Sequence, residues 1–348
     1  MTSRSIGTWG LAFFSLLFCF LFAEVICRVF FPDEQLRWTD DPDVLARYAP
    51  GQHARLTIAD GKTSFPIAIN ELGFRDLPLS QLPRRKILTL GDSFAFGWGV
   101  SEDEVFSSLL GRSLGPEIGV LNGGHPGFGV WQLEATLRRV APLVKPELTM
   151  VILWEGMFAR RPPSDEAKAA FFRKSSWLHK AKTASLFGTY VYRRLETVLS
   201  RLGLVSLIVT METDGAAGVQ TGTNDSAFLR GFEADKQRLL AVSEEASSNG
   251  GKILLVLWPR AGFSSEETLS ASRELETVLA AFAVENGLPF VSLRQAFAGV
   301  ARERLLIPKD FHPTALAHCL VSAYLLESLR VLGYGVKAKP FCGVKGIV

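Results

Sequence analysis

Two short motifs carry side chains that are able to perform nucleophilic chemistry. Ser93 lies in a Gly-Asp-Ser triplet directly after an apolar segment, and His312 lies two residues after Asp310 near the C-terminus. A serine alcohol is a weak nucleophile until a base takes its proton, and a histidine base needs a partner that fixes its tautomer. Ser93, His312 and Asp310 therefore predict a nucleophile, a base and an orienting acid. Either motif alone is typical of an ordinary turn or cap, so the hypothesis depends on the pair.

The elements around these motifs alternate between short apolar strands and helices. Apolar strands separated by helices indicate a parallel sheet with helices on both faces, which predicts an α/β/α sandwich with about five strands. Ser93 follows the first strand and His312 precedes the last helix, so both fall at edges where such folds bind ligands. The expected strands are Lys86–Leu90, Ile118–Leu121, Leu148–Trp154, Lys252–Leu257 and Pro289–Leu293. The expected helices are Ser101–Ser113, Trp131–Val144, Ala227–Ser248, Glu266–Asn286 and Thr314–Leu332, the first of them opened by a capping box of Ser101 and Glu104.

A third motif, Asn-Gly-Gly-His-Pro-Gly from Asn122 to Gly127, follows the second expected strand. Together with the Gly-Asp-Ser and Asp-x-His-Pro motifs it resembles the SGNH (GDSL) hydrolase superfamily, over roughly residues 50–335. The segment Ile69–Arg75 resembles the membrane-anchored bacterial members. This resemblance implies a flavodoxin-like fold and ester chemistry through an acyl-serine, with Ser93 as nucleophile and His312 as base. It also implies that the backbone N–H groups of Ser93 and Gly127 stabilise the oxyanion.

Two positions depart from the family pattern. The family's third block supplies an Asn side chain to the oxyanion, and Met157 stands at that position here, where a thioether has no proton to donate. Loss of one such donor typically costs about 10²–10³ in rate, unless Asn122 or another side chain compensates. Many members place the acid three residues before the histidine, whereas Asp310 is two before, a spacing that resembles the polysaccharide O-acetyltransferase branch. His125 is either a substrate contact or a plain loop residue.

The N-terminus contains a long apolar segment. Between Arg4 and Glu24 there are no charged residues, and the apolar character continues to Phe31. A helix of this length matches the roughly 30 Å hydrocarbon core of a membrane. A cleaved signal peptide is the alternative, but the segment is long and lacks the small residues of a cleavage site. We therefore expect an uncleaved anchor over residues 6–31, with the body on the extracytoplasmic side of the cytoplasmic membrane.

The rest of the chain is divided by composition. Residues 32–83 are rich in Pro, Asp and Gly and contain two alternating segments, Ala54–Ile58 and Phe65–Ile69, which predict a β-hairpin lead-in. The hydrolase-like domain is expected at 84–335, with a helical insertion at 158–226 and a tail at 336–348. The first half of the insertion is basic, so it is either a solvated segment or a lid that contacts anionic lipid headgroups.

Composition excludes several classes of protein. The 348 residues contain 38 Lys and Arg against 35 Asp and Glu, so the net charge of +3 gives no support for nucleic-acid binding. Four cysteines are too few for a disulfide scaffold, although Cys319 and Cys342 could pair. No metal-binding motif is present, and we expect neither a metal nor a cofactor.

Three functions are compatible with these features. The first is a membrane-anchored esterase or deacylase that acts on an O-acylated saccharide or lipid. The second is an O-acyltransferase that passes the acyl group to a cell-surface polysaccharide. The third, motivated by Met157, is a catalytically impaired binding protein that keeps the fold. No protein partner can be predicted, and the membrane is the expected partner of the N-terminal helix.

Overall fold

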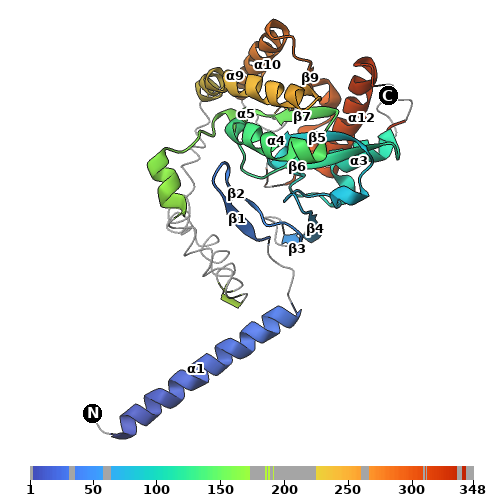
Figure 1. Ribbon diagram of the computed structural model, residues 1–348. Helices are drawn as coiled ribbons and strands as arrows, with labels where there is room; N and C mark the ends of the chain where they lie inside the picture. Colours follow the sequence, from blue (N-terminus) through green and yellow to red (C-terminus); the bar gives the residue numbers. More distant parts are fainter. Residues whose placement is uncertain are drawn as a thin grey trace.

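The computed structural model describes most of the chain (Figure 1). Parts of the chain for which predictions were made, among them most of the 158–226 insertion and Cys342, lie outside the described residues. The described residues are 3–30, 36–57, 64–172, 185, 187–188, 191, 225–259, 266–308, 310, 312–334 and 339–341.

The centre of the body is a five-stranded parallel sheet in the order β6-β5-β7-β8-β9. The interior strands are buried along most of their length, because helices cover both faces of a parallel sheet. This arrangement confirms the predicted α/β/α class and the flavodoxin-like strand order. The strands are β5 (Arg85–Gly91), β6 (Ile118–Gly124), β7 (Leu148–Leu153), β8 (Lys252–Leu257) and β9 (Phe290–Ser292).

Two groups of helices cover the sheet. Helices α4, α9 and α10 pack together on one side, and α3 packs with α12 on the other (Figure 1). The longer helices are α3 (Phe106–Leu114), α4 (Val130–Val144), α9 (Asp225–Ser248), α10 (Glu266–Glu285) and α12 (Ala315–Val331). The short elements are η1 (Leu79–Gln81), α2 (Ser93–Phe96), η2 (Glu102–Glu104), α5 (Glu155–Phe158), η3 (Gln295–Phe297) and α11 (Arg302–Leu305).

One predicted helix is divided in two. The capping box is present, with the N–H of Ser101 donating to Glu104, but it caps the N-terminus of the 3-10 turn η2 and not that of a longer helix. Val105 is extended, and α3 begins at Phe106. The ring of His318 on α12 accepts the first N–H of α3, so this buried histidine serves as a helix cap. Burial lowers the pKa of His318 to about 3, which keeps the ring neutral and able to accept.

Two antiparallel hairpins precede the sheet. The predicted one is confirmed as β3 (Gln52–Thr57) paired with β4 (Ser64–Ile69). A second hairpin, of β1 (Trp38–Asp41) and β2 (Leu45–Tyr48), was not predicted, because four-residue strands leave almost no alternation to detect. Asp41 fixes it to the body, since its carboxylate accepts from Arg47 and, at 2.6 Å, from Arg139 on α4.

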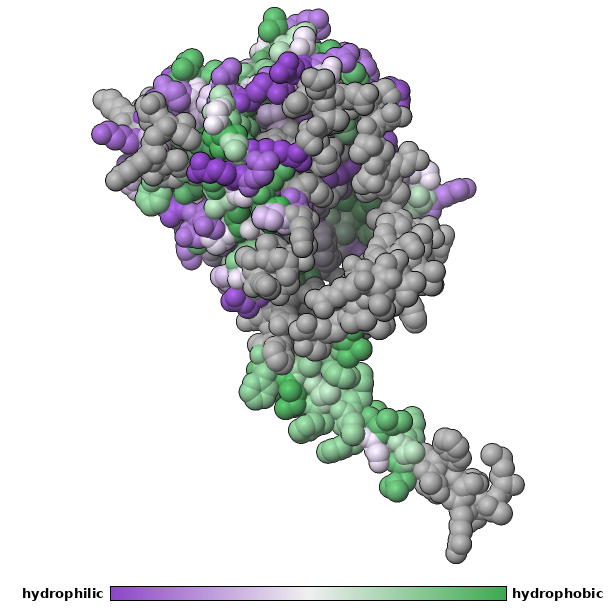
Figure 2. All heavy atoms as spheres, turned by 180° about the vertical axis from the view of Figure 1, so that it is seen from behind, coloured by the Kyte–Doolittle hydropathy of each residue, from purple (hydrophilic) through white to green (hydrophobic). Residues whose placement is uncertain are grey.

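Helix α1 (Ser3–Phe30) extends away from the body as an apolar rod (Figure 2). Residues Gly10–Phe30 have a mean hydropathy of 2.3 and are long enough to cross a membrane, a property that signal sequences share. Glu24 near its end pairs with Arg28 and accepts hydrogen bonds from the Ser185 hydroxyl and the Phe187 N–H. A carboxylate in an apolar helix is costly without partners, and these contacts supply them.

Candidate active site

Ser93 is held at the carboxyl end of the sheet by a sharp strand-to-helix turn. β5 ends at Gly91, Asp92 caps the next helix through the N–H of Phe94, and Ser93 is the first residue of α2. The side chain is nearly buried, with 5% of the residue exposed. The turn therefore places the hydroxyl at the edge where parallel sheets bind ligands, as the sequence predicts.

His312 comes to Ser93 from a loop 219 residues later in the chain. A bridge between Leu306 and Pro313 closes this loop, and the carbonyl of His312 accepts from the N–H of Ile307. Its Nε2 lies 2.9 Å from the Ser93 Oγ, and its Nδ1 lies 2.6 Å from Asp310 Oδ1. The same carboxylate oxygen accepts the backbone N–H of His312 at 3.0 Å.

This geometry joins the three side chains that the sequence predicts. With its proton on Nδ1, the imidazole donates to Asp310, and its Nε2 accepts from the Ser93 hydroxyl. That tautomer can take the serine proton as the oxygen attacks a carbonyl carbon. The shorter acid spacing is sufficient, because Asp310 contacts both the ring and the backbone of His312. The arrangement is able to perform acyl transfer.

A second loop, after β6, closes over the same edge. The N–H of His125 donates to the carbonyl of Gly91 at 3.0 Å, which holds this loop against the serine turn. Gly124 is required there, since a Cβ would lie 2.2 Å from the Phe96 nitrogen. Gly127 has a φ of 84°, a conformation that favours glycine. The Asn122 amide is occupied by the backbone: its Nδ2 donates to Phe96 and its Oδ1 accepts from Gly124.

His125 is packed among aromatic rings. Its ring lies 4.1 Å from Phe128, 4.8 Å from Tyr48 and 5.0 Å from Trp38 by centroid distance. The residue is only 2% exposed, and burial lowers its pKa to about 3. The imidazole is therefore neutral over the physiological pH range, and its packing against Phe128 helps to hold the loop that contains Gly127.

Arg160 joins the serine turn to the loop after β6, a role that the sequence did not suggest. Its Nη1 donates to Asp92 Oδ2 at 2.7 Å and to the Phe128 carbonyl at 2.6 Å. The side chain of Asp92 is completely buried and also accepts from the indole of Trp154. A basic residue at the start of a basic insertion is expected to be solvated, so nothing in the local sequence distinguishes Arg160. Its neighbour Arg161 pairs with the buried Asp235 on α9.

Replacement of Arg160 by Gln should slow acylation of Ser93 by roughly tenfold to a hundredfold, because small displacements of catalytic groups have effects of that size. It should also destabilise the fold by about 3 kcal/mol, since it leaves the buried Asp92 without its cation. Ester hydrolysis measured alongside thermal unfolding separates the two effects. Arg161→Gln is the matched control and should keep the wild-type kcat. A folded Arg160→Gln protein with an unchanged kcat would contradict the role of this clamp.

Arg75 supports the serine turn from the lead-in side. The residue is 1% exposed, and its guanidinium donates to the carbonyls of Phe96, Gly97 and Val100. Burial lowers its pKa to about 10, so the group still carries its charge at neutral pH. The sequence shows Arg75 only as the last residue of the Ile69–Arg75 segment, and this structural role was missed.

Met157 is wholly buried in α5, the short helix that follows β7. No hydrogen-bond donor therefore comes from this side chain, as the sequence implies. Glu155 in the same helix is also buried, and it accepts from the hydroxyl of Ser272 on α10. This part of the chain contacts the serine turn through Trp154 and Arg160, which both donate to Asp92.

Comparisons with known proteins return only structural neighbours: no protein-family model and no curated protein matches the sequence. One neighbour is a G-D-S-L family lipolytic protein from Veillonella parvula, with 12% identity, a TM-score of 0.43, and coverage of 71% of this chain and 98% of that one. Another is a lipase/acylhydrolase from Enterococcus faecalis, with 16% identity, a TM-score of 0.41, and coverage of 74% and 98%. A third is a catalytic mutant of an acetylxylan esterase from Geobacillus stearothermophilus, with 15% identity, a TM-score of 0.41, and coverage of 72% and 95%.

The sheet order and the contact between Ser93 and His312 are the arrangement that the sequence motifs implied. The chain has a flavodoxin-like α/β/α fold.

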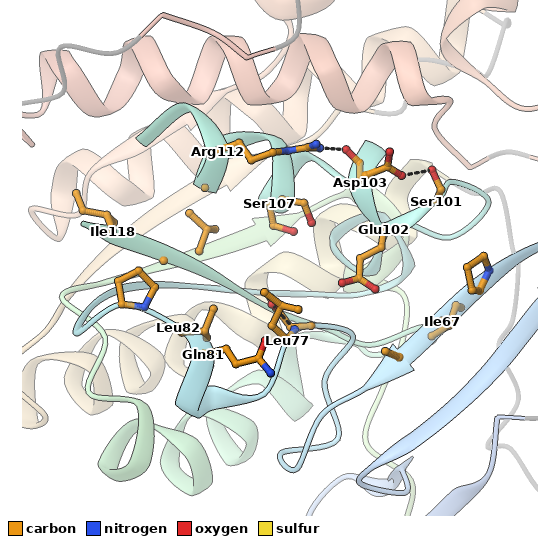
Figure 3. A pocket seen from close by; sticks show the side chains of 18 of the residues that line it. Ile67, Leu77, Gln81, Leu82, Ser101, Glu102, Asp103, Ser107, Arg112 and Ile118 are labelled. Atoms are coloured by element: carbon orange, nitrogen blue, oxygen red, sulfur yellow. Dashed lines mark hydrogen bonds between the residues drawn. The ribbon is translucent and has the colours of Figure 1, made fainter. Parts of the chain in front are cut away.

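A large cavity lies away from Ser93, His312 and Asp310, none of which lines it. It measures about 910 Å³ and runs between the β3–β4 hairpin, β6 and α3 (Figure 3). Glu102, Gln81 and Ser107 line it, together with Asp76, whose carboxylate accepts the N–H of Asn122 and whose pKa burial raises to about 7. Within the described ranges, no cluster of His, Cys, Asp and Glu is placed to hold a metal ion.

Proposed function

We propose that this protein is a serine esterase of the SGNH type that acts through an acyl-serine. The observation that carries the proposal is the continuous chain from Ser93 Oγ through His312 to Asp310, with contacts of 2.9 and 2.6 Å. Ser93 attacks the ester carbonyl while His312 Nε2 takes its proton. The imidazolium, held by Asp310, then returns this proton to the departing alcohol. Water activated by the same histidine releases the acid and restores Ser93.

The oxyanion is stabilised by the backbone N–H groups of Ser93 and Gly127. Because Met157 supplies no third donor, we expect a slower enzyme than one with a complete set, by about 10²–10³. The clamp of Arg160 on Asp92 and Phe128 keeps the two loops in register and so preserves the remaining donors. These remaining donors favour an esterase of reduced activity over a binding protein that has lost catalysis.

A transferase is the second candidate. The acyl-serine is common to both reactions, and a sugar hydroxyl would replace water in the second step. The Asp-x-His spacing, which resembles the O-acetyltransferase branch, favours this candidate. Product analysis distinguishes the two reactions, since a transferase yields an acylated acceptor and a hydrolase yields the free acid.

We place the body on the extracytoplasmic side of a membrane, anchored by α1. The apolar length of Gly10–Phe30 supports the anchor. Cys319 is disulfide-bonded, and disulfides persist in oxidising compartments. Cys19 and Cys27 are free and lie within α1. The substrate in this compartment is an O-acylated saccharide or lipid.

The test is covalent labelling of the full-length protein in detergent micelles with a fluorophosphonate probe. We expect one labelled peptide in the mass spectrum, containing Ser93. A folded protein that takes up no label and hydrolyses no ester would show that the triad is not a working nucleophile, and the binding-protein reading would replace this proposal.

A further inference from the structure

A second, smaller cavity lies beside the triad and is walled by aromatic side chains. It measures about 380 Å³. Trp38 and Tyr48 come from the β1–β2 hairpin, Trp98 follows α2, and Gly127 belongs to the loop after β6. We call it the aromatic pocket. Its remaining lining residues are Leu36, Arg55, Leu56 and Pro126.

The aromatic pocket adjoins the reacting groups on one side. The N–H of Trp98 donates to the Ser93 carbonyl at 3.0 Å, and its ring lies 5.9 Å from the His312 ring. Gly127, on the other wall, carries one of the two N–H groups assigned above to the oxyanion. Trp98 and Gly127 thus place the pocket next to the position that an ester carbonyl takes at Ser93.

The lining indicates which chemical group fits. Trp38 is 36% exposed and Trp98 is partly exposed, so both present indole surface to an incoming group. Tyr48 is buried behind Trp38, with ring centroids 4.3 Å apart, and keeps that indole in place. Flat aromatic surface suits rigid rings that have an apolar face and polar edges. The volume is at the low end of the roughly 300–1,000 Å³ range of small-molecule sites, which suits one ring better than an extended chain.

We propose that the aromatic pocket binds a sugar ring of an O-acylated saccharide and so presents its ester to Ser93. This inference rests on the proposed function and narrows its substrate class from saccharide or lipid to saccharide. The lead-in hairpins are then part of the substrate site, because they contribute Trp38, Tyr48 and Arg55. Arg55 adds a donor-only group at the wall, suited to hydroxyl or carboxylate oxygens of the ring.

The kinetic test compares two acetyl esters, p-nitrophenyl acetate and an O-acetylated methyl xyloside, on the full-length protein in detergent. Trp38→Ala should raise KM for the xyloside about tenfold and leave kcat within twofold, while Trp38→Phe should recover most of the loss. KM for p-nitrophenyl acetate should change much less. Leu77→Ala, in the wall of the larger cavity, is the matched control and should change neither substrate.

A binding test separates this inference from the proposed function. Methyl xyloside without an ester is titrated against the Ser93→Ala protein, with saturation-transfer NMR as the readout. Signal that disappears in Ser93→Ala/Trp38→Ala supports the pocket even if no ester is turned over. Equal xyloside kinetics in wild type and Trp38→Ala would overturn the inference while leaving the esterase intact. A KM increase confined to long-chain p-nitrophenyl esters would overturn it in favour of a lipid substrate.

Discussion

Replacement of Ser93 by Ala should reduce ester hydrolysis by at least about 10⁴-fold and abolish fluorophosphonate labelling. The substitution removes the hydroxyl oxygen that lies 2.9 Å from His312 Nε2, so no acyl-serine can form at this position. Any residual rate would come from substrate binding and the backbone donors acting on water. Hydrolysis of p-nitrophenyl acetate, measured with the labelling, provides both readouts on one sample.

The chain offers a matched control in Ser107. This serine on α3 is as buried as Ser93, with 1% exposure, and its hydroxyl has no hydrogen-bond partner among the described residues. Ser107→Ala should retain wild-type labelling and hydrolysis. If Ser93→Ala kept its activity while remaining folded, another nucleophile would be responsible and the proposed mechanism would be wrong.

Replacement of Asp310 by Asn should lower kcat by roughly 10²–10⁴-fold with little change in KM. An Asn oxygen can still accept the His312 N–H, so the loop should keep its shape. The NH₂ group of the Asn side chain, however, donates to Nδ1 of His312 and so favours the tautomer with the ring proton on Nε2. In that tautomer Nε2 can no longer accept the proton of Ser93. A kcat and KM measurement, with far-ultraviolet circular dichroism as a folding check, tests this expectation.

Asp103→Asn is the control for loss of one carboxylate. Asp103 is exposed beside Ser101 and Arg112, and it should be replaceable without effect on kcat. A kcat for Asp310→Asn within threefold of wild type would mean that the shorter acid spacing does not orient the imidazole, and that another acceptor performs that role.

The fold and the proximity of Ser93 to His312 were predictable because their sequence signals are local. Apolar strands between helices predict the parallel sheet, and Ser93 and His312 each lie in a short motif at a strand or helix end. In contrast, the contacts of Arg160 and Arg75 depend on chain segments that meet only after folding. Arg160 reaches 68 residues back to Asp92, and its neighbours in sequence are Ala159 and Arg161. No periodicity or spacing reports such a contact.

The aromatic pocket was missed for a related reason. Trp38 lies in a four-residue strand, and its contact with the ring of His125 joins the lead-in to the loop after β6. The sequence identifies the lead-in only as a hairpin at Ala54–Ile58 and Phe65–Ile69, and assigns it no part in the site. The β1–β2 hairpin contributes Trp38 and Tyr48 to the pocket wall, and the ion pair of Asp41 with Arg139 of α4 holds it there.

The short distance along the chain between α1 and β1 limits where this protein can work. Phe30 ends α1 and Trp38 begins β1, so eight peptide steps separate the apolar helix from the pocket wall. Fully extended, they reach about 30 Å. With α1 in a bilayer, Trp38 can rise no further than that above its surface, so the proposed substrate site would lie close to the lipid headgroups. Such an enzyme would modify a polymer while it is still near the membrane, and would not reach material already deposited further out.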